Sequence, residues 1–476
     1  MKRVLLVALL GLTVAGTATA AGSTNDPYVA RQWYLGRDHA LDTLDAAKQL
    51  FTVRVAVIDS GVELNHPELK NRVVAHRSFV GGTVADTIGH GTFVAGEIAA
   101  IADNNAGIAG LAPPARLVVA KVVRDDGTIP PKAEAQAIRW AVRQGARVVN
   151  LSLGSTRDPS DPDVDGFSPV EQRAVEYAVR HGALVVAAAG NGNDAPQKPW
   201  PFASYPAAFP HVLAVGAYGP LGGVPSFSNR DDRLVDLAAP GMDIFSLFPH
   251  ALTAAFGACV EQGYSSCGTK EYRHADGTSF AAPQVAAAAA LLFGESAALR
   301  PDQVTEILKL SASDATVSNG CAECSPGPDA LTGFGRLDVG EALDSLQGPP
   351  PTPDRFEPND DAGARSAIVW KPLVATATLD WWDDPNDVYR IHLNRGQRLS
   401  VFVRGGSTKV DPSIVLWKPG LHNLSDARSD LRARRSIHGP GVPERIRFRA
   451  HRTAWYSLQV KLAKPGFGAY RIRLAF

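Results

Sequence analysis

Apolar residues along most of the chain fall into short, strongly hydrophobic runs that alternate with longer amphipathic segments. Two of these segments, Pro131–Gln144 and Ser168–Arg180, have the spacing of helices. The runs are rich in β-branched residues and predict strands: Val53–Ile58, Leu117–Val123, Val148–Leu151, Leu184–Ala188 and Val212–Val215. Because strands alternate with helices, we expect an α/β fold in which a mostly parallel sheet is flanked by helices.

The period of the pattern changes to two near the end of the chain. Leu458, Val460 and Leu462 alternate with polar residues, and the same alternation runs from Tyr470 to Phe476. Such half-buried strands predict a small all-β sandwich over residues 355–476. A Pro-rich stretch precedes it, so we interpret residues 348–354 as a linker and residues 21–347 as the first domain.

The N-terminus has the pattern of a secretory signal peptide. A basic start, Met1-Lys2-Arg3, is followed by an apolar run and by Thr17-Ala18-Thr19-Ala20, which predicts a signal peptide over residues 1–20. A membrane anchor needs roughly 20 apolar residues, and this run is shorter. Val285–Phe293 is also too short, so we expect a mature protein without a membrane span that is secreted, periplasmic or extracellular, of bacterial type.

Charge and composition exclude several classes of protein. Lys+Arg 48 balances Asp+Glu 48, which argues against a whole-chain surface for nucleic acid or anionic membrane. Hydrophobic residues make up 45% and charged residues 20%, as in a packed globular protein. Arg445, Arg447 and Arg449 alternate with apolar residues, which favours the solvated face of a strand over a polyanion site.

The four cysteines form two close pairs. Cys259 and Cys267 flank a Gly-containing loop, and Cys321 and Cys324 form a Cys-x-x-Cys motif beside turn residues. In a reducing compartment that motif would suggest redox or metal chemistry. In an exported protein we favour two local disulfides, Cys259–Cys267 and Cys321–Cys324, over a catalytic dithiol.

Three reactive side chains stand at the ends of predicted elements. Asp59 follows the strand that starts at Val53, His90 stands between two glycines before a helical run, and Ser279 opens an Ala-rich helix. Taken singly, each has an ordinary structural explanation as a turn cap, a structural histidine or a helix N-cap. Small residues and Pro283 around Ser279 are not explained by a cap.

Together the three segments resemble the subtilisin-like serine proteases over about residues 25–345. Leu151-Ser152-Leu153-Gly154 and Ala187-Ala188-Ala189-Gly190-Asn191 extend the resemblance. It implies a serine endopeptidase with a catalytic triad of Asp59, His90 and Ser279 and an oxyanion hole that includes Asn191. Two departures from the family pattern are Phe93 and Phe280, where relatives usually carry His and Met.

The resemblance also implies the substrate-binding residues. Ser152, Leu153 and Gly154 would pair with an extended peptide as a strand. Ala188, Ala189 and Gly190 would line a pocket for a large apolar side chain. We therefore expect the protein to act on protein or peptide substrates. We also expect it to be a monomer.

No cofactor is expected for catalysis, but the resemblance extends to a structural Ca²⁺ site. Asp26, Glu68 and Asn105 stand in segments similar to the calcium-binding segments of the family, and their oxygens suit this ion. The alternative is that these residues form plain turns and caps. The loop is one residue shorter than in many relatives, and Glu68 replaces the usual Asp.

The C-terminal part has its own resemblance, to the bacterial pre-peptidase C-terminal domain. The motifs that carry it are Phe356-Glu357-Pro358-Asn359-Asp360, Asp387-Val388-Tyr389 and Asp411-Pro412-Ser413.

Two other function classes remain as alternatives to a protease. A silent peptide-binding protein would need a hidden defect in an intact triad, and a dinucleotide-binding enzyme lacks the Gly-x-Gly-x-x-Gly that should follow its first strand.

Overall fold

The computed structural model describes residues 24–192, 195–253, 271–346, 354–380, 384–407, 410–424, 427–463 and 466–476. The predicted signal peptide, nearly all of the linker and the predicted Cys259–Cys267 pair lie outside these ranges.

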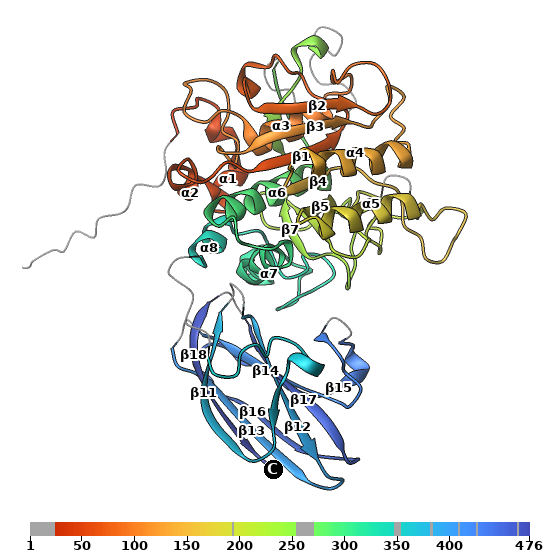
Figure 1. The fold of residues 1–476 in the computed structure, drawn as a ribbon. Helices are drawn as coiled ribbons and strands as arrows, with labels where there is room; N and C mark the ends of the chain where they lie inside the picture. The colour runs from red at the N-terminus through yellow and green to blue at the C-terminus, as the bar shows by residue number, and fades with distance from the viewer. Residues whose placement is uncertain are drawn as a thin grey trace, which may run out of the picture.

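A seven-stranded sheet forms the centre of the first part of the chain (Figure 1), and its order is β2-β3-β1-β4-β5-β6-β7. All neighbouring strands pair in parallel; Val57 of β1, for example, lies between Val119 of β3 and Asn150 of β4. Its members are β1 (Arg54–Asp59), β2 (Val73–Ser78), β3 (Arg116–Lys121), β4 (Val148–Leu151), β5 (Leu184–Ala188), β6 (Val212–Tyr218) and β7 (Leu237–Pro240). The predicted parallel sheet is confirmed, and its near-continuous apolar strands are buried because helices cover both faces.

Two helices cover one face of this sheet, and two other helices cover the opposite face. α4 (Pro131–Arg143) and α5 (Pro169–Arg180) pack on each other and on β1, β3, β4 and β5. On the other face α6 (Thr278–Glu295) crosses β4 to β7 and contacts α3 (His90–Ala99). α6 is almost wholly buried, and its run of alanines allows close approach to the strands.

Shorter elements complete this domain. A two-stranded antiparallel ribbon of β8 (Ile244–Leu247) and β9 (Tyr272–Ala275) packs on α3. The remaining helices are α1 (Trp33–Arg37), α2 (Ala40–Ala47), α7 (Pro301–Ser311), α8 (Val339–Asp344) and the 3₁₀ turns η1 (Val29–Arg31), η2 (Pro67–Leu69), η3 (His250–Leu252) and η4 (Val317–Asn319).

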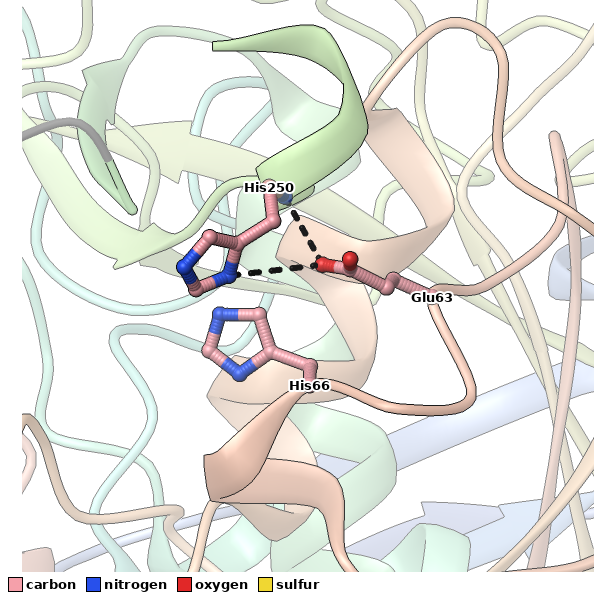
Figure 2. A group of neighbouring side chains, drawn as sticks. All are labelled: Glu63, His66 and His250. Atoms are coloured by element: carbon pink, nitrogen blue, oxygen red, sulfur yellow. Dashed lines mark hydrogen bonds and ion pairs between the residues drawn. The ribbon is translucent and has the colours of Figure 1, made fainter.

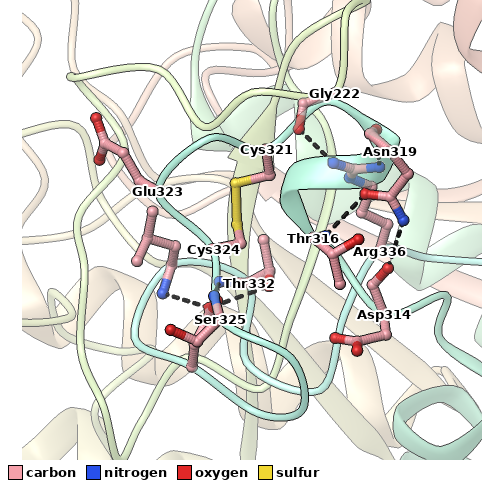
Figure 3. The surroundings of a disulfide bond; sticks show 12 residues. Gly222, Asp314, Thr316, Asn319, Cys321, Glu323, Cys324, Ser325, Thr332 and Arg336 are labelled. Carbon is pink, nitrogen blue, oxygen red and sulfur yellow. Dashed lines mark hydrogen bonds between the residues drawn. A yellow bond between two sulfur atoms is a disulfide. The ribbon is translucent and has the colours of Figure 1, made fainter.

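A disulfide joins Cys321 to Cys324 in the loop that follows η4 (Figure 3). Both cysteines are buried against Ala315. The Arg336 guanidinium lies beside this loop and donates hydrogen bonds to the carbonyls of Asn319 and Gly222. The bridge is thus a local staple that closes a turn.

The last part of the chain forms two sheets that pack face to face beneath α7 and α8 in Figure 1. One has the order β10-β12-β17-β14-β15 and the other β11-β18-β13-β16. Pairing is antiparallel except between β10 and β12. The strands are β10 (Ala367–Val369), β11 (Leu373–Asp380), β12 (Asn386–Leu393), β13 (Arg398–Gly405), β14 (Pro412–Trp417), β15 (Arg432–Ser436), β16 (Glu444–Arg449), β17 (Ala454–Leu462) and β18 (Phe467–Ala475), with short 3₁₀ turns at η5 (Gly363–Arg365) and η7 (Ser429–Leu431).

Alternation within these strands separates a core face from a solvent face. In β18 Tyr470, Ile472 and Leu474 are buried while Arg471 and Arg473 are exposed, as the sequence pattern predicts. The Tyr470 hydroxyl lies 2.7 Å from that of Tyr389 in β12, which joins the two sheets through their core. Within the described part of the chain, no helix has the length and apolar character needed to cross a membrane.

Candidate active site

β1 and α3 bring an aspartate and a histidine together at the carboxyl end of the sheet. Asp59 is the last residue of β1, and His90 is the first residue of α3. The Nδ1 atom of His90 lies 2.8 Å from Oδ1 of Asp59, which is 1% exposed. The same oxygen accepts the Ser60 N–H at 2.6 Å. These bonds fix the aspartate and hold the imidazole in one orientation.

A second buried carboxylate, which the sequence analysis missed, organises the turn before His90. Asp86 Oδ1 accepts the Ser60 hydroxyl at 2.8 Å and the Gly89 N–H at 2.7 Å. Its Oδ2 accepts both the N–H and the hydroxyl of Thr92, at 2.8 and 2.7 Å. Asp86 therefore connects the loop after β1 with the first turn of α3. Only its position four residues before the histidine hinted at this role.

The environment of His90 favours its protonated form. Burial alone would lower the pKa of His90, but the negative charges of Asp59 and Asp86 and the hydrogen bond that His90 donates to Asp59 raise it above the ordinary value of 6.5. Phe280 packs against the ring, with centroids 5.2 Å apart, and in turn contacts Phe93 at 4.5 Å. Phe93 and Phe280, the two residues that differ from the family pattern, thus form an apolar wall beside His90.

The start of α6 places Ser279 next to the side chain of Asn191. Thr278, the first residue of the helix, donates to Asn191 Oδ1 from its backbone N–H at 2.9 Å and from its hydroxyl at 2.8 Å. The Thr278 hydroxyl also accepts the Gly190 N–H at 3.1 Å. Because Thr278 engages the amide oxygen of Asn191, the NH₂ group of Asn191 remains as a hydrogen-bond donor for the neighbouring cavity.

A cavity of about 180 Å³ opens beside Ser279 and Asn191. Of the residues predicted to bind substrate, Leu153, Gly154, Ala188 and Gly190 line it. Its remaining walls carry hydroxyl and amide groups, from Ser155, Thr156, Ser204, Asn229 and Thr278, together with Gly192, Ala195 and the Trp200 ring. The pocket is therefore more polar than the sequence suggested.

Ala189 and Ser152 do not line this cavity, which corrects the expectation for Ala189. The Ala189 side chain is fully buried, because residues that alternate along an extended segment point to opposite sides. Ser152 is 2% exposed, and its hydroxyl accepts the Asn150 amide at 2.9 Å.

Gly190 must be glycine for the pocket to exist. Its φ of +105° lies in a region that other residues rarely adopt, and a Cβ there would lie 2.2 Å from Ser204 Oγ. The close approach lets the Gly190 backbone form one wall of the cavity.

These groups are the ones that acyl transfer to a serine requires. Ser279 supplies a hydroxyl at a helix start, where backbone N–H groups lack intrahelical partners. The Asp59–His90 pair could supply a base, because the hydrogen bond at Nδ1 leaves Nε2 free to accept a proton.

The segments predicted to bind calcium lie next to one another, although some of their carboxylate oxygens already accept hydrogen bonds from the protein. Asp26 accepts the N–H groups of Asp103 at 2.9 Å and Asn104 at 3.1 Å. Glu68 accepts the Asn104 amide at 3.3 Å, and its buried Oε2 has no partner among the described residues. Burial raises the pKa of Glu68 to about 7. Asp26 and Glu68 fit a Ca²⁺ ion, whereas the Asn105 N–H bonds to Asn25 and its role stays a prediction.

Glu63, His66 and His250 form a cluster beyond the active site (Figure 2). His66 is fully buried, and its Nδ1 accepts the Glu68 N–H at 3.3 Å, so the neutral ring carries its proton on Nε2, toward His250. A metal would need that nitrogen free. His250 binds Glu63 through its backbone N–H at 2.8 Å and Glu271 through Nε2 at 2.6 Å. We therefore interpret the cluster as a structural link between the loop after β1 and η3.

The sandwich contains a third group of ionisable residues, all carboxylates: Asp354, Glu357, Asp360, Asp384 and Asp387. Both Asp384 oxygens are buried without a partner among the described residues. Burial raises the pKa of Asp384 to about 10 and that of Asp387 to about 8. Such a set of oxygens suits a cation such as Ca²⁺.

Comparisons with known proteins agree with this geometry. The profile of the Subtilase family matches residues 52–335. The chain is 38% identical over 247 residues to the major intracellular serine protease of Bacillus subtilis, covering 50% of this chain and 68% of that one. It is 37% identical over 272 residues to thermitase of Thermoactinomyces vulgaris, covering 56% and 84%. A lanthipeptide protease crystal structure superimposes with a TM-score of 0.55 at 26% identity, covering 69% of this chain and 99% of that one. The chain therefore belongs to the subtilase family of serine-type endopeptidases.

Proposed function

We propose that this endopeptidase cleaves peptide bonds through an acyl-enzyme formed on Ser279. His90 takes the hydroxyl proton as general base and returns it to the leaving amine. Asp59 holds the imidazole and stabilises its protonated form. The observation that carries this proposal is the 2.8 Å contact of His90 with Asp59, combined with Ser279 at the start of α6 beside Asn191.

Asn191 and the backbone N–H of Ser279 would stabilise the oxyanion of the tetrahedral intermediate. The support is that Thr278 engages the amide oxygen of Asn191 and leaves its NH₂ group as the donor. The extended segment Ser152–Gly154 would pair with the substrate backbone, and the cavity beside Gly190 would take one substrate side chain.

The proposal extends to the organisation of the chain and its location. Catalysis needs no cofactor in this family; a structural Ca²⁺ at Asp26, Glu68 and Asn105 is supported by the orphaned Glu68 oxygen. The signal-peptide pattern of residues 1–20 supports secretion. Residues 21–347 would be the catalytic domain and residues 355–476 a separate sandwich of the pre-peptidase C-terminal type.

Labelling with a fluorophosphonate probe tests the nucleophile. The full chain is treated with the probe, digested and analysed by mass spectrometry. Modification confined to the peptide that contains Ser279, and absent in His90→Ala, is the expected result because the serine reacts only with its base in place. A chain that remains unlabelled would instead be a silent peptide-binding protein.

A further inference from the structure

Charge is distributed very unevenly along this neutral chain. Residues 354–476 hold twenty-one Lys and Arg against twelve Asp and Glu, so the rest of the chain carries the matching negative excess. Within the sandwich the charges separate again, since residues 395–476 hold seventeen basic and only four acidic residues. Such asymmetry is typical of domains that bind polyanions.

The arginines gather on the outer face of the sheet β11-β18-β13-β16, and Figure 1 shows where the strands of this sheet lie. This face exposes seven of them and no Asp or Glu among its described strand residues: Arg398, Arg404, Arg445, Arg447, Arg449, Arg471 and Arg473. Two pairs are direct cross-strand neighbours, Arg398 with Arg449 and Arg404 with Arg471. Like charges placed directly opposite destabilise a sheet, so folding alone does not explain this arrangement.

Two adjoining cavities run along the edge where β16 meets β15 of the other sheet. Their volumes are about 670 and 520 Å³, and they share Arg434, Phe448 and His451. No Asp or Glu lines either one. The basic groups along this groove are Arg398, Lys418, Arg432, Arg434, Arg447, Arg449, His451 and Arg452. None of its arginines forms an ion pair with a described residue.

We infer that this arginine groove binds a linear acidic polysaccharide. Guanidinium groups match sulfate and carboxylate groups in a bidentate way, and they carry their charge at every relevant pH. Arg447 and Arg449 lie two residues apart on one face of β16, about 7 Å along the strand, so they can meet successive anionic groups of an extended chain. The sandwich would thereby hold the protease on an anionic polymer.

The lining of the groove favours a polysaccharide over single-stranded nucleic acid or a lipid surface. Tyr456 is 2% exposed and offers no open platform on which a base could stack, and Phe448 is only partly exposed and packs against Tyr456 at 5.4 Å. None of the exposed large apolar side chains of the described chain lies in the groove, and a membrane-binding surface would need such an anchor.

Paired variants of the full-length protein test the proposal. Arg447→Gln with Arg449→Gln removes two charges from the groove on β16. Arg471→Gln with Arg473→Gln removes two charges, at the same spacing, from β18 outside it. Binding of a labelled heparin oligosaccharide is measured by fluorescence anisotropy over a range of NaCl concentrations, with uncharged dextran and single-stranded DNA as competitors.

The groove variant should bind at least about tenfold more weakly, with a shallower salt dependence, while the β18 variant should change by less than about threefold. The melting temperature of the groove variant should not fall, because Arg449 no longer opposes Arg398. Equal losses in both variants would show diffuse charge and overturn the site. Tighter competition by DNA than by unlabelled heparin would overturn the ligand class.

Discussion

Asn191 accepts two hydrogen bonds from Thr278, one from its backbone N–H and one from its hydroxyl. Thr278 is fully buried, and its hydroxyl also accepts the N–H of Gly190. The residue that precedes Ser279 therefore sets the orientation of the Asn191 amide and the position of the pocket wall. The Thr278 hydroxyl thus connects the proposed oxyanion donor Asn191 with Gly190 in the pocket wall.

Thr278→Val keeps the shape of this residue and removes the hydroxyl. Asn191 then keeps one of its two anchoring bonds, and the loss of about 1 kcal/mol predicts a kcat lower by about fivefold. KM for a short peptide should change little, because the oxyanion forms only after binding. Steady-state kinetics check this, and Thr278→Ser should retain most of the activity. An equal loss in both variants would contradict the orienting role of the hydroxyl.

Asp86→Asn should shift the pH profile. The negative charges of Asp59 and Asp86 raise the pKa of His90, and the base must be neutral to act, so kcat/KM should fall with decreasing pH already above 6.5. Removal of the Asp86 charge lowers that pKa, so the acid limb should move to lower pH. The measurement is kcat/KM of both proteins from pH 5 to 9. An acid limb that stays in place would show that Asp86 acts through geometry alone.

Calcium should stabilise the protease domain in a pH-dependent way. Burial raises the pKa of Glu68 from 4.5 to about 7, so calcium-free protein loses stability as the pH rises from 4.5 to 7 and holds an uncompensated buried charge above pH 7. The gain in melting temperature on addition of calcium should therefore be larger at pH 8.5 than at pH 6. Melting curves with EDTA and with calcium measure it.

Two variants assign that effect to one of the two carboxylate clusters. Glu68→Gln should abolish the calcium-dependent rise in the melting of the protease domain, whereas Asp384→Asn in the sandwich should leave it unchanged. If Asp384→Asn abolished the rise and Glu68→Gln did not, the stabilising ion would bind in the sandwich. The prediction of a site at Asp26, Glu68 and Asn105 would then be wrong.

A chain that ends at residue 347 should cleave a short peptide within about threefold of the full-length rate. The proposed catalytic and oxyanion residues all precede the linker, and the sheets of each part are built only from strands of that part. Kinetics on one short peptide and one protein substrate, with circular dichroism to verify folding, check this. A folded truncated enzyme that loses turnover by orders of magnitude would show that the sandwich belongs to the active unit.

The sequence predicts elements best where periodicity is strong and motifs are local. The parallel sheet and the alternation of Tyr470, Ile472 and Leu474 follow from simple patterns, and Asp59, His90 and Ser279 are recognisable by their flanking residues. Asp86 and Thr278 were missed because their roles come from hydrogen bonds between segments distant in sequence. Likewise, the sequence pattern of Arg447 is that of an ordinary exposed strand residue. Its place in a basic groove depends on Arg398 of β13 and Arg434 of β15, which are distant in sequence.

The burial of Ala189 marks another limit of motif reasoning. A short motif identifies a segment, but the alternation of an extended backbone decides which of its side chains face the cavity. The polar wall formed by Ser204 and Asn229 comes from other parts of the chain and has no local signal.

The central claim is that Ser279 is the nucleophile of a peptide-bond hydrolase, and the kinetics of Ser279→Ala test it most directly. The wild-type and variant full-length proteins are compared on one chromogenic peptide, with circular dichroism to establish equal folding. Because triad members act as a unit, kcat should fall by about 10⁶-fold. A folded Ser279→Ala protein with turnover comparable to wild type would contradict the account.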